Sequence, residues 1–258
     1  GWLVLDDKEW RIKDGILIAP NFSFAVKKEQ KAIKVIDQKP ELGGNIKGEK
    51  KDFFEALENL PSPLWANPYF QTEGAFLNIS LGEKDYNRFI NQLKGSLKIL
   101  EIGADSGWSA ANLAQKHQVT ALDINDHLFL RDFWLQKGRY FEAIQTDMHE
   151  LPFQKESFDL IFASAAIHHS SDLKKVAGEI FRVLKKGGSF MFLREPMRGK
   201  WARSDFGRKQ KTLGVSENLY SKEEWQAIFQ KAGFRHLKIK LSYLEYPRHR
   251  KYFLRRAK

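Results

Sequence analysis

The sequence contains no cysteine and no long apolar run, and each absence excludes a class of protein. Without cysteine there is no disulfide scaffold, no thiolate zinc or iron–sulfur site and no cysteine nucleophile. The best apolar run, 160–167, is far shorter than the ~18 residues that a membrane-spanning helix needs, so we expect no membrane span. Asp6 and Asp7 stand where a signal peptide would be basic, and we therefore expect a cytoplasmic protein.

The composition is that of a folded protein with an excess of positive charge. Hydrophobic residues make up 42% of the 258 residues and aromatic residues 13%, which favours a packed core over disorder. The net charge is +11, and basic residues crowd at 194–211 and 248–258. Such clusters attract polyanions. They indicate either a solubilising surface or a face that binds nucleic acid or an anionic substrate.

The pattern of the chain changes near residue 95. Residues 1–95 form an N-terminal extension in which short apolar segments predict a small β meander followed by helices. Its expected strands are 10–13, 16–18, 22–26 and 32–36, and its expected helices are 52–60 and 85–94.

Residues 96–258 alternate between strand and helix, which is typical of an α/β domain with a mostly parallel sheet. The Gly187-Gly188 pair predicts a glycine cap for the helix before it, and Ser221 begins a capping box. The expected strands are 97–102, 118–123, 140–146, 158–164 and 189–194, with a closing antiparallel pair at 234–244 and 251–255. The expected helices are 109–116, 127–137, 173–184 and 221–233.

Candidate functional residues follow the predicted parallel strands, where ligands bind in an open sheet of this kind. The loop 101–107 contains two glycines but lacks the spacing of a dinucleotide-binding loop. Asp123 is placed to accept hydrogen bonds from a ribose diol, or alternatively to cap a helix. Asp147 and Met148 offer an acceptor and a soft surface to an adenine ring, or are a loop carboxylate and a packing side chain. The run 158–169, which begins with a predicted strand, ends at the same edge with His168 and His169.

Together these motifs resemble the class I S-adenosylmethionine-dependent methyltransferases, closest to the ubiquinone and menaquinone C-methylase group. The resemblance covers residues 97–195 in order and spacing. It rests on the segments 100–107, 121–124, 147–153, 158–169 and 182–188. It implies a Rossmann-like, mostly parallel seven-stranded sheet with flanking helices, and a basic insertion at 196–220 that shares in acceptor choice.

The resemblance also implies a set of cofactor-binding residues. Those of the first loop surround the methionine part of S-adenosylmethionine, Asp123 holds the ribose, and Asp147 meets the adenine edge. The whole set is Glu101, Gly103, Ala104, Asp105, Gly107, Asp123, Ile124, Asp147, Met148, Ser164 and Ala165. Asp105 departs from the family, which usually has glycine there; its side chain either crowds the cofactor or bonds the ammonium group.

Direct methyl transfer needs an acceptor held in line and shielded from water. If the acceptor is a hydroxyl or a carbon acid, a base helps, and His168 and His169 are the candidates for it. The alternative for both is a capping or packing histidine, and His149 is expected at the surface. We expect no resident metal.

The acceptor is predicted to be a small or medium-sized metabolite, with S-adenosylhomocysteine as the second product. One alternative is an RNA methyltransferase that uses the basic clusters, although 164–167 lacks the sequence that amino-methylating nucleic-acid enzymes usually carry there. Another is a non-catalytic protein that binds the cofactor or a partner.

Overall fold

A computed structural model describes residues 2–5, 8–13, 16–20, 22, 24–37, 86–105, 107–125, 131–198, 211–212, 214–241 and 249–256. The strands are β1 (Trp2–Leu5), β2 (Lys8–Lys13), β3 (Ile16–Ile18), β4 (Lys98–Ile102), β5 (Gln118–Asp123), β6 (Glu142–Gln145), β7 (Phe158–Ser164), β8 (Leu184–Pro196), β9 (Phe234–Leu241) and β10 (His249–Arg256). The helices are α1 (Phe24–Asp37), α4 (Trp108–Leu113), α5 (Arg131–Gln136), the 3₁₀ turn η4 (Ile167–His169), α6 (Leu173–Val183) and α8 (Lys222–Lys231).

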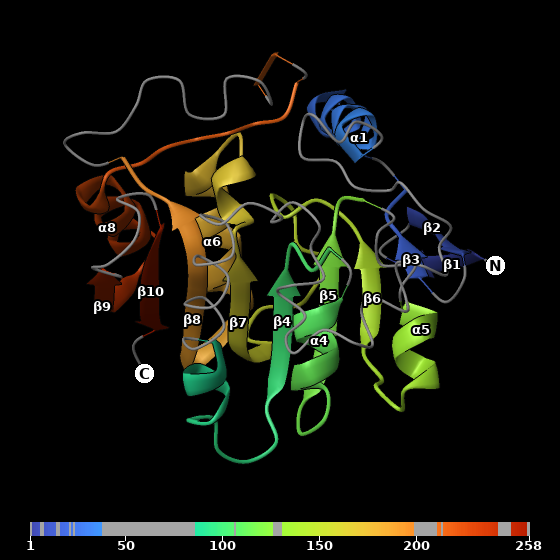
Figure 1. The fold of residues 1–258 in the computed structure, drawn as a ribbon, viewed down its shortest axis with the longest axis horizontal. Coiled ribbons are helices and arrows are strands. Elements are labelled where there is room, and N and C mark those ends of the chain that lie inside the picture. Colours follow the sequence, from blue (N-terminus) through green and yellow to red (C-terminus); the bar gives the residue numbers. More distant parts are fainter. Residues whose placement is uncertain are drawn as a thin grey trace, which may run out of the picture.

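The strands form one sheet in the order β1-β2-β3-β6-β5-β4-β7-β8-β10-β9 (Figure 1). The strands from β3 to β8 pair in parallel, and β10 inserts antiparallel between β8 and β9. The seven strands from β6 to β9 are the predicted sheet, so the expected α/β fold is confirmed. The N-terminal meander continues this sheet, because β3 pairs with β6.

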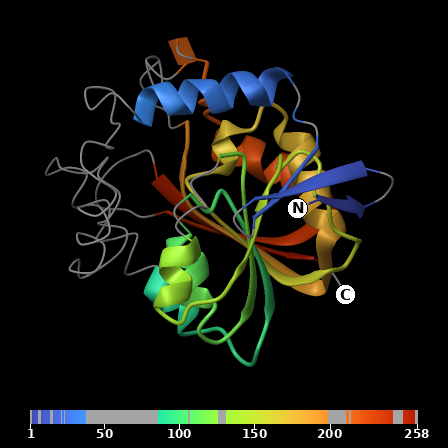
Figure 2. The same cartoon turned by 90° about the vertical axis from the view of Figure 1, so that its right-hand side faces the viewer.

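Each face of the sheet carries its own hydrophobic core. On one face α6 and α8 pack through Ile180, Trp225 and Phe229. On the other, α4 and the short helix at 86–90 cover the strands, with Tyr86 and Phe89 in that core. Figure 2 shows the two helical layers on either side and α1 lying across the carboxyl edge of the strands. Strand β7 is almost continuously apolar and is covered on both faces, as the sequence indicates, and β4 is likewise buried from Ile99 to Ile102.

Helix α1 contradicts the two strands expected at 22–26 and 32–36. Val26 and Ala32 are buried while the lysines between them are exposed, so this segment is an amphipathic helix. Windows of five residues do not distinguish alternation from the helical period, and the charged 27–31 stretch is made of good helix formers. The helix expected at 52–60 lies outside the described residues.

The glycine cap expected at Gly187-Gly188 is also wrong. Helix α6 ends at Val183, and Leu184 is already extended as the first residue of β8. A Cβ on Gly188 would lie 2.9 Å from the carbonyl oxygens of Asp159 and Lys185, so this glycine permits close packing of the β8 backbone. The capping box at Ser221 is confirmed.

Replacing Ser221 tests how far the capping box fixes the start of α8. Ser221→Ala removes the acceptor for the Glu224 N–H, and we expect a loss of about 1 kcal/mol in the free energy of unfolding. Urea denaturation measures it. Ser221→Asp keeps an acceptor and is the control; equal stability of the alanine variant and the wild type would contradict the prediction.

Candidate active site

The loops that follow β4, β5, β6, β7 and β8 meet at one edge of the sheet, beneath α1 (Figures 1 and 2). This is the edge at which the sequence places every candidate residue. Three non-glycine residues there, Asp105, Ala165 and Arg194, have positive φ angles of 48°, 51° and 60°. Backbone strain of this kind concentrates at functional sites.

The loop after β4 needs its glycines for packing as well as for conformation. Gly103 and Gly107 have φ of 72° and 74°. A Cβ on Gly103 would lie 2.3 Å from the Ala166 side chain, and one on Gly107 would lie 2.5 Å from the Phe141 ring. The Gly103 and Ala104 N–H groups both donate to the Leu122 carbonyl, which ties the loop to β5.

Asp123 joins the loop after β4 to the loop after β5. Its Oδ2 accepts the Asp105 N–H at 2.9 Å, and its Oδ1 accepts the Asn125 N–H at 2.9 Å. Asp105 is exposed and contributes this bond through its backbone, in a left-handed conformation that Asp tolerates better than most residues. The Asn125 side-chain amide also donates to Oδ1, at 3.3 Å, so both carboxylate oxygens of Asp123 hold the loops at this edge.

Glu101 is a buried carboxyl group near the end of β4, directly before the loop that contains Gly103 and Gly107. Burial raises the pKa of Glu101 to about 8, against the opposing hydrogen bond from Ser109. The Ser109 hydroxyl donates to its Oε1, while its Oε2 is buried with no hydrogen-bond partner. An unsatisfied buried carboxyl oxygen is unfavourable. A cationic group placed beside it would satisfy this oxygen and favour the ionised form.

The residues after β6 are more buried and make more hydrogen bonds than the sequence indicates. The Asp147 Oδ1 accepts the His149 N–H at 2.9 Å and lies 2.6 Å from its Nδ1. His149 Nε2 lies 2.9 Å from the Ser170 hydroxyl, so the expectation that His149 is a surface residue is wrong. Met148 is 9% exposed and belongs to the core under α6.

Helix α1 contacts two of the loops beneath it. The Gln30 side-chain amide donates to the carbonyl of Ile124, directly after β5. The Glu29 carboxylate accepts the Ser216 N–H at 3.2 Å, in the segment that follows β8. Burial raises the pKa of Glu29 to about 7. The sequence gives no sign of these contacts, because 27–31 reads as a solvated charged stretch.

A small cavity of about 30 Å³ lies beside Ser164, at the end of β7. Burial lowers the pKa of Arg194 in its wall to about 10, against the attraction of Glu195. The predicted cofactor residue Ser164 therefore borders a cavity with aromatic walls and a cationic end. Its lining is Tyr86, Trp108, Ser109, Phe162, Ser164, Leu193 and Arg194.

His168 is held between two carboxylates. Its Nδ1 lies 2.6 Å from Glu195 Oε2 and its Nε2 lies 3.5 Å from Glu217 Oε2. These carboxylates raise the pKa of His168 to about 9 despite its burial. The ring is therefore protonated at neutral pH and, without a change of state, it is unsuited to accept a proton.

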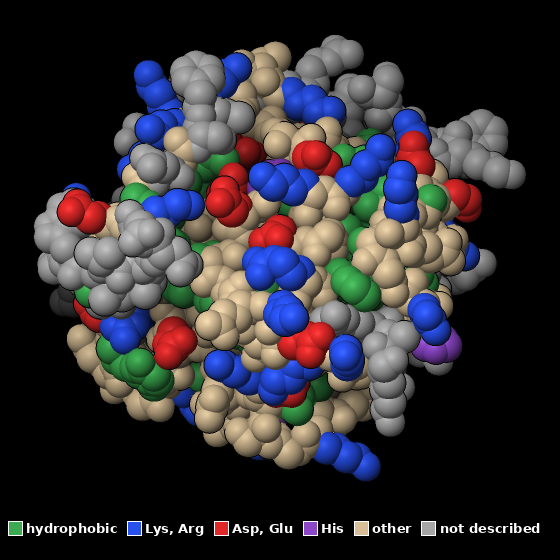
Figure 3. Space-filling model, turned by 180° about the vertical axis from the view of Figure 1, so that it is seen from behind, with side chains coloured by type: hydrophobic (Ala, Val, Ile, Leu, Met, Phe, Trp, Pro, Cys, Tyr) green, Lys and Arg blue, Asp and Glu red, His purple; other side chains and the backbone are tan. Residues whose placement is uncertain are grey.

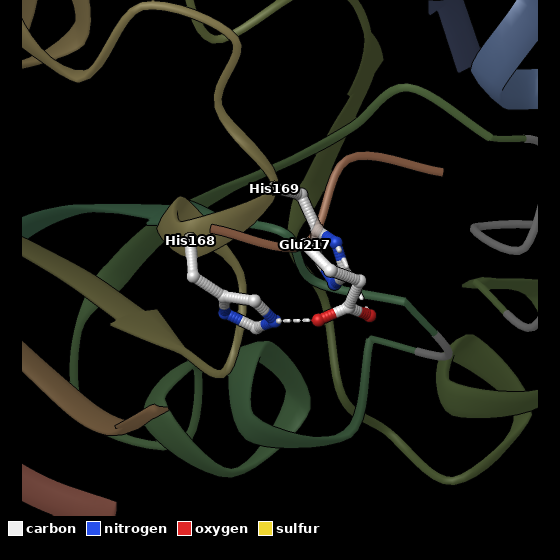
Figure 4. Close-up of side chains that lie close together, drawn as sticks. All are labelled: His168, His169 and Glu217. Carbon is white, nitrogen blue, oxygen red and sulfur yellow. Dashed lines mark ion pairs between the residues drawn. The ribbon is translucent and has the colours of Figure 1, made fainter. Parts of the chain in front are cut away.

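His169 also lies beside Glu217 (Figure 4), but its ring is neutral. Burial and the neighbouring His168 lower the pKa of His169 to about 4. Its Nδ1 is 2.6 Å from the Ser216 carbonyl oxygen, so Nδ1 carries the hydrogen and Nε2 is the acceptor atom. Of the two predicted bases, His169 is the one with a free acceptor nitrogen in this state.

Two functional residues in this region, Glu195 and Glu217, are absent from the sequence-based set. Glu195 ends β8, and the rule that singled out Asp123 applies to it equally. Glu217 does not follow a strand, because it lies in an irregular segment 48 residues beyond His169, so no sequence rule singles it out. Only the tertiary fold brings it to η4.

Residues 100–192 match the methyltransferase domain family. Taken with the fold and the loop geometry, this match decides the assignment. Residues 100–192 belong to the class I S-adenosylmethionine-dependent methyltransferases.

Curated relatives of the methyltransferase domain act on different acceptors. Sterol 24-C-methyltransferase ERG6A of Gibberella zeae is 27% identical over 55% of this chain and 40% of its own length. Sarcosine/dimethylglycine N-methyltransferase of Aphanothece halophytica is 35% identical over 39% of this chain and 38% of its own. The chain thus spans less than half the length of these relatives.

The solved structure of phosphoethanolamine N-methyltransferase 2 from Haemonchus contortus, in complex with S-adenosyl-L-methionine, shares the fold of the methyltransferase domain. The TM-score is 0.58 at 16% identity, over 80% of this chain and 60% of that one. Among the described residues, no helix is both long and apolar enough to cross a membrane.

Glu195→Ala removes a carboxylate that is 0% exposed and leaves the buried His168 without its closest partner. We expect a loss of about 3–5 kcal/mol in the free energy of unfolding, as for other broken buried ion pairs. Guanidinium denaturation monitored by tryptophan fluorescence measures it. Glu150→Ala, at an exposed carboxylate, is the control; similar losses in both variants would refute a special role for Glu195.

The raised pKa of Glu101 makes the ligand-free protein less stable as pH increases. The folded state holds the proton up to about pH 8, whereas the unfolded state releases it near the ordinary value of 4.5. This contribution to stability is therefore full below about pH 4.5 and is lost progressively up to about pH 8. In Glu101→Gln the corresponding slope of unfolding free energy against pH should disappear; a slope unchanged from the wild type would show that Glu101 titrates normally.

Proposed function

We propose that this chain is an S-adenosylmethionine-dependent methyltransferase that methylates a small or medium-sized metabolite. The buried Oε2 of Glu101, which has no hydrogen-bond partner, carries the proposal. It lies in the loop that the family uses for the methionine part of the cofactor, and a cation is the group it needs. The residues present therefore fit the cofactor.

The bound cofactor supplies an activated methyl group on a sulfonium sulfur. Glu101 holds the positively charged end, and Asp123 accepts hydrogen bonds from the ribose hydroxyls. Asp147 contributes acceptor capacity next to the adenine, although His149 already occupies its Oδ1. The aromatic wall that includes Tyr86 and Trp108 excludes water from the acceptor side.

If the acceptor must lose a proton, His169 is the candidate base. Its neutral ring and free Nε2 allow it to take a proton from a hydroxyl or a carbon acid. The low pKa limits its strength as a base, so its main contribution is to orient the acceptor. The relatives, a sterol 24-C-methyltransferase and a sarcosine/dimethylglycine N-methyltransferase, support a small-molecule acceptor.

The RNA alternative has less support. Much of the two basic clusters lies outside the described residues, and on the face covered by α6 and α8 basic side chains alternate with acidic ones (Figure 3). Arg182 and Arg198 on that side are paired with Glu179 and Glu224. A cytoplasmic location stays a prediction, and a non-catalytic protein stays the second alternative.

Calorimetric titration with S-adenosylmethionine and S-adenosylhomocysteine tests the proposal directly. We expect both to bind the wild type, and Asp123→Ala to lose about 10- to 100-fold in affinity because hydrogen bonds to a charged acceptor are removed. Asp132→Ala, at an exposed aspartate on α5, is the matched control. If neither ligand binds the folded wild type, the non-catalytic alternative replaces the enzyme.

The cofactor should also expel the proton of Glu101. Near pH 7 this carboxyl group is mainly neutral without ligand, and a cation against it favours ionisation. Titrations in two buffers of different ionisation enthalpy should show proton release with the wild type, and less with Glu101→Gln. Equal proton release in both proteins would place the cation elsewhere.

A further inference from the structure

Three side chains beyond the proposed cofactor residues converge at η4. His168 and His169 come from the turn after β7, and Glu217 from the segment between β8 and α8 (Figure 4). Each offers one nitrogen or carboxylate oxygen, and the three atoms lie within 4.8 Å of one another. Two imidazoles and a carboxylate are the ligand types of zinc and non-haem iron sites.

The separation between His168 and Glu217 is that of two ligands of one ion rather than of a charge-assisted hydrogen bond. His168 Nε2 lies 3.5 Å from Glu217 Oε2. A charge-assisted hydrogen bond would be about 2.7–2.9 Å long. Two ligand atoms bound tetrahedrally to one ion at about 2.0–2.2 Å lie roughly 3.3–3.6 Å apart.

The outer contacts of the two histidines supply an independent observation. His168 Nδ1 lies 2.6 Å from Glu195, and His169 Nδ1 lies 2.6 Å from the Ser216 carbonyl oxygen. Metal-binding histidines almost always direct the second ring nitrogen to a carboxylate or a backbone carbonyl. In both rings Nδ1 therefore bonds to the protein in the way seen around metal-binding histidines, and Nε2 is the atom that would bind the ion.

The backbone holds these ligands before any ion arrives. Glu195 accepts the N–H groups of Ala166, Ile167 and His168, which fixes η4. The Asn218 N–H donates to the His168 carbonyl, so Glu217 is anchored to the same turn. Preorganisation of this kind favours binding, because little conformational entropy remains to be lost.

We propose that His168, His169 and Glu217 bind a divalent transition-metal ion, with zinc as the type ion. The proton on His168 leaves to solvent when the ion binds, as metal binding requires. Three protein ligands leave one position open, and the 30% exposure of the His169 side chain gives access to it.

The role of the ion rests on the proposed function. The open position would hold an oxygen of the acceptor, and the ion would lower the pKa of an acceptor hydroxyl before methyl transfer. His169 is then a ligand and no longer orients the acceptor as a free imidazole.

Titration of the chelator-treated protein with ZnCl₂ tests the site without any assay of activity. We expect a single equivalent of Zn²⁺ to bind, while Mg²⁺, which prefers oxygen ligands, binds much more weakly. Co²⁺ should give the visible absorption of a low-coordinate nitrogen and oxygen site. His169→Gln and Glu217→Gln should each weaken Zn²⁺ binding at least 100-fold and abolish the Co²⁺ spectrum.

His236→Gln, at an exposed histidine on β9, is the matched control and should leave Zn²⁺ binding unchanged. Thermal unfolding without metal checks that the variants fold; if Glu217→Gln does not, the part-exposed His169 still decides the question. Absence of Zn²⁺ binding to the wild type, or binding that survives His169→Gln, overturns the proposal.

The two proposals fail separately. S-adenosylmethionine binding without Zn²⁺ binding would remove the metal site and leave the methyltransferase in place. Zn²⁺ binding without S-adenosylmethionine binding would keep the site and remove the role assigned to its open position.

Discussion

The active-site edge depends on the buried carboxylate of Glu195. This side chain, at the end of β8, accepts three successive backbone N–H groups from 166–168 and contacts the ring of His168. The turn after β7 must leave the sheet at a fixed angle to meet these bonds, and Ser164, at the end of β7, lines the cavity. The strained φ of Ala165 is maintained because the surrounding contacts determine it.

Around Glu195, hydrogen bonds join segments of the chain that are far apart in sequence. Asp123 links the loops after β4 and β5, Glu195 links β8 to η4, and Glu29 links α1 to the segment after β8. Each link uses a carboxylate that accepts backbone N–H groups, so the order of the edge depends on buried acceptors rather than on apolar packing. This explains why buried charge is concentrated at the carboxyl edge, while the two cores are almost entirely apolar.

The parallel strands and the loops that follow them could be predicted because their signals are local. A buried strand such as Phe158–Ser164 shows in its own residues, and Asp123 follows directly from the end of one. Helix α1 is not evident from the sequence because its apolar residues are few and its helical period shows only over more than five residues. Glu195 and Glu217 could not be recognised as partners of His168, since their meaning depends on distances that only the fold sets.

The contact between α1 and Ile124 has a consequence for how this site can change over time. Gln30 binds the carbonyl of residue 124 and not its side chain, and the Gln145 amide donates to the same carbonyl. The hydrogen bond that holds α1 therefore does not depend on which side chain is present at position 124. A substitution at position 124, the residue predicted to pack on the adenine, would therefore leave the contact with α1 in place, so the fit of a cofactor and the position of the covering helix can change independently during evolution.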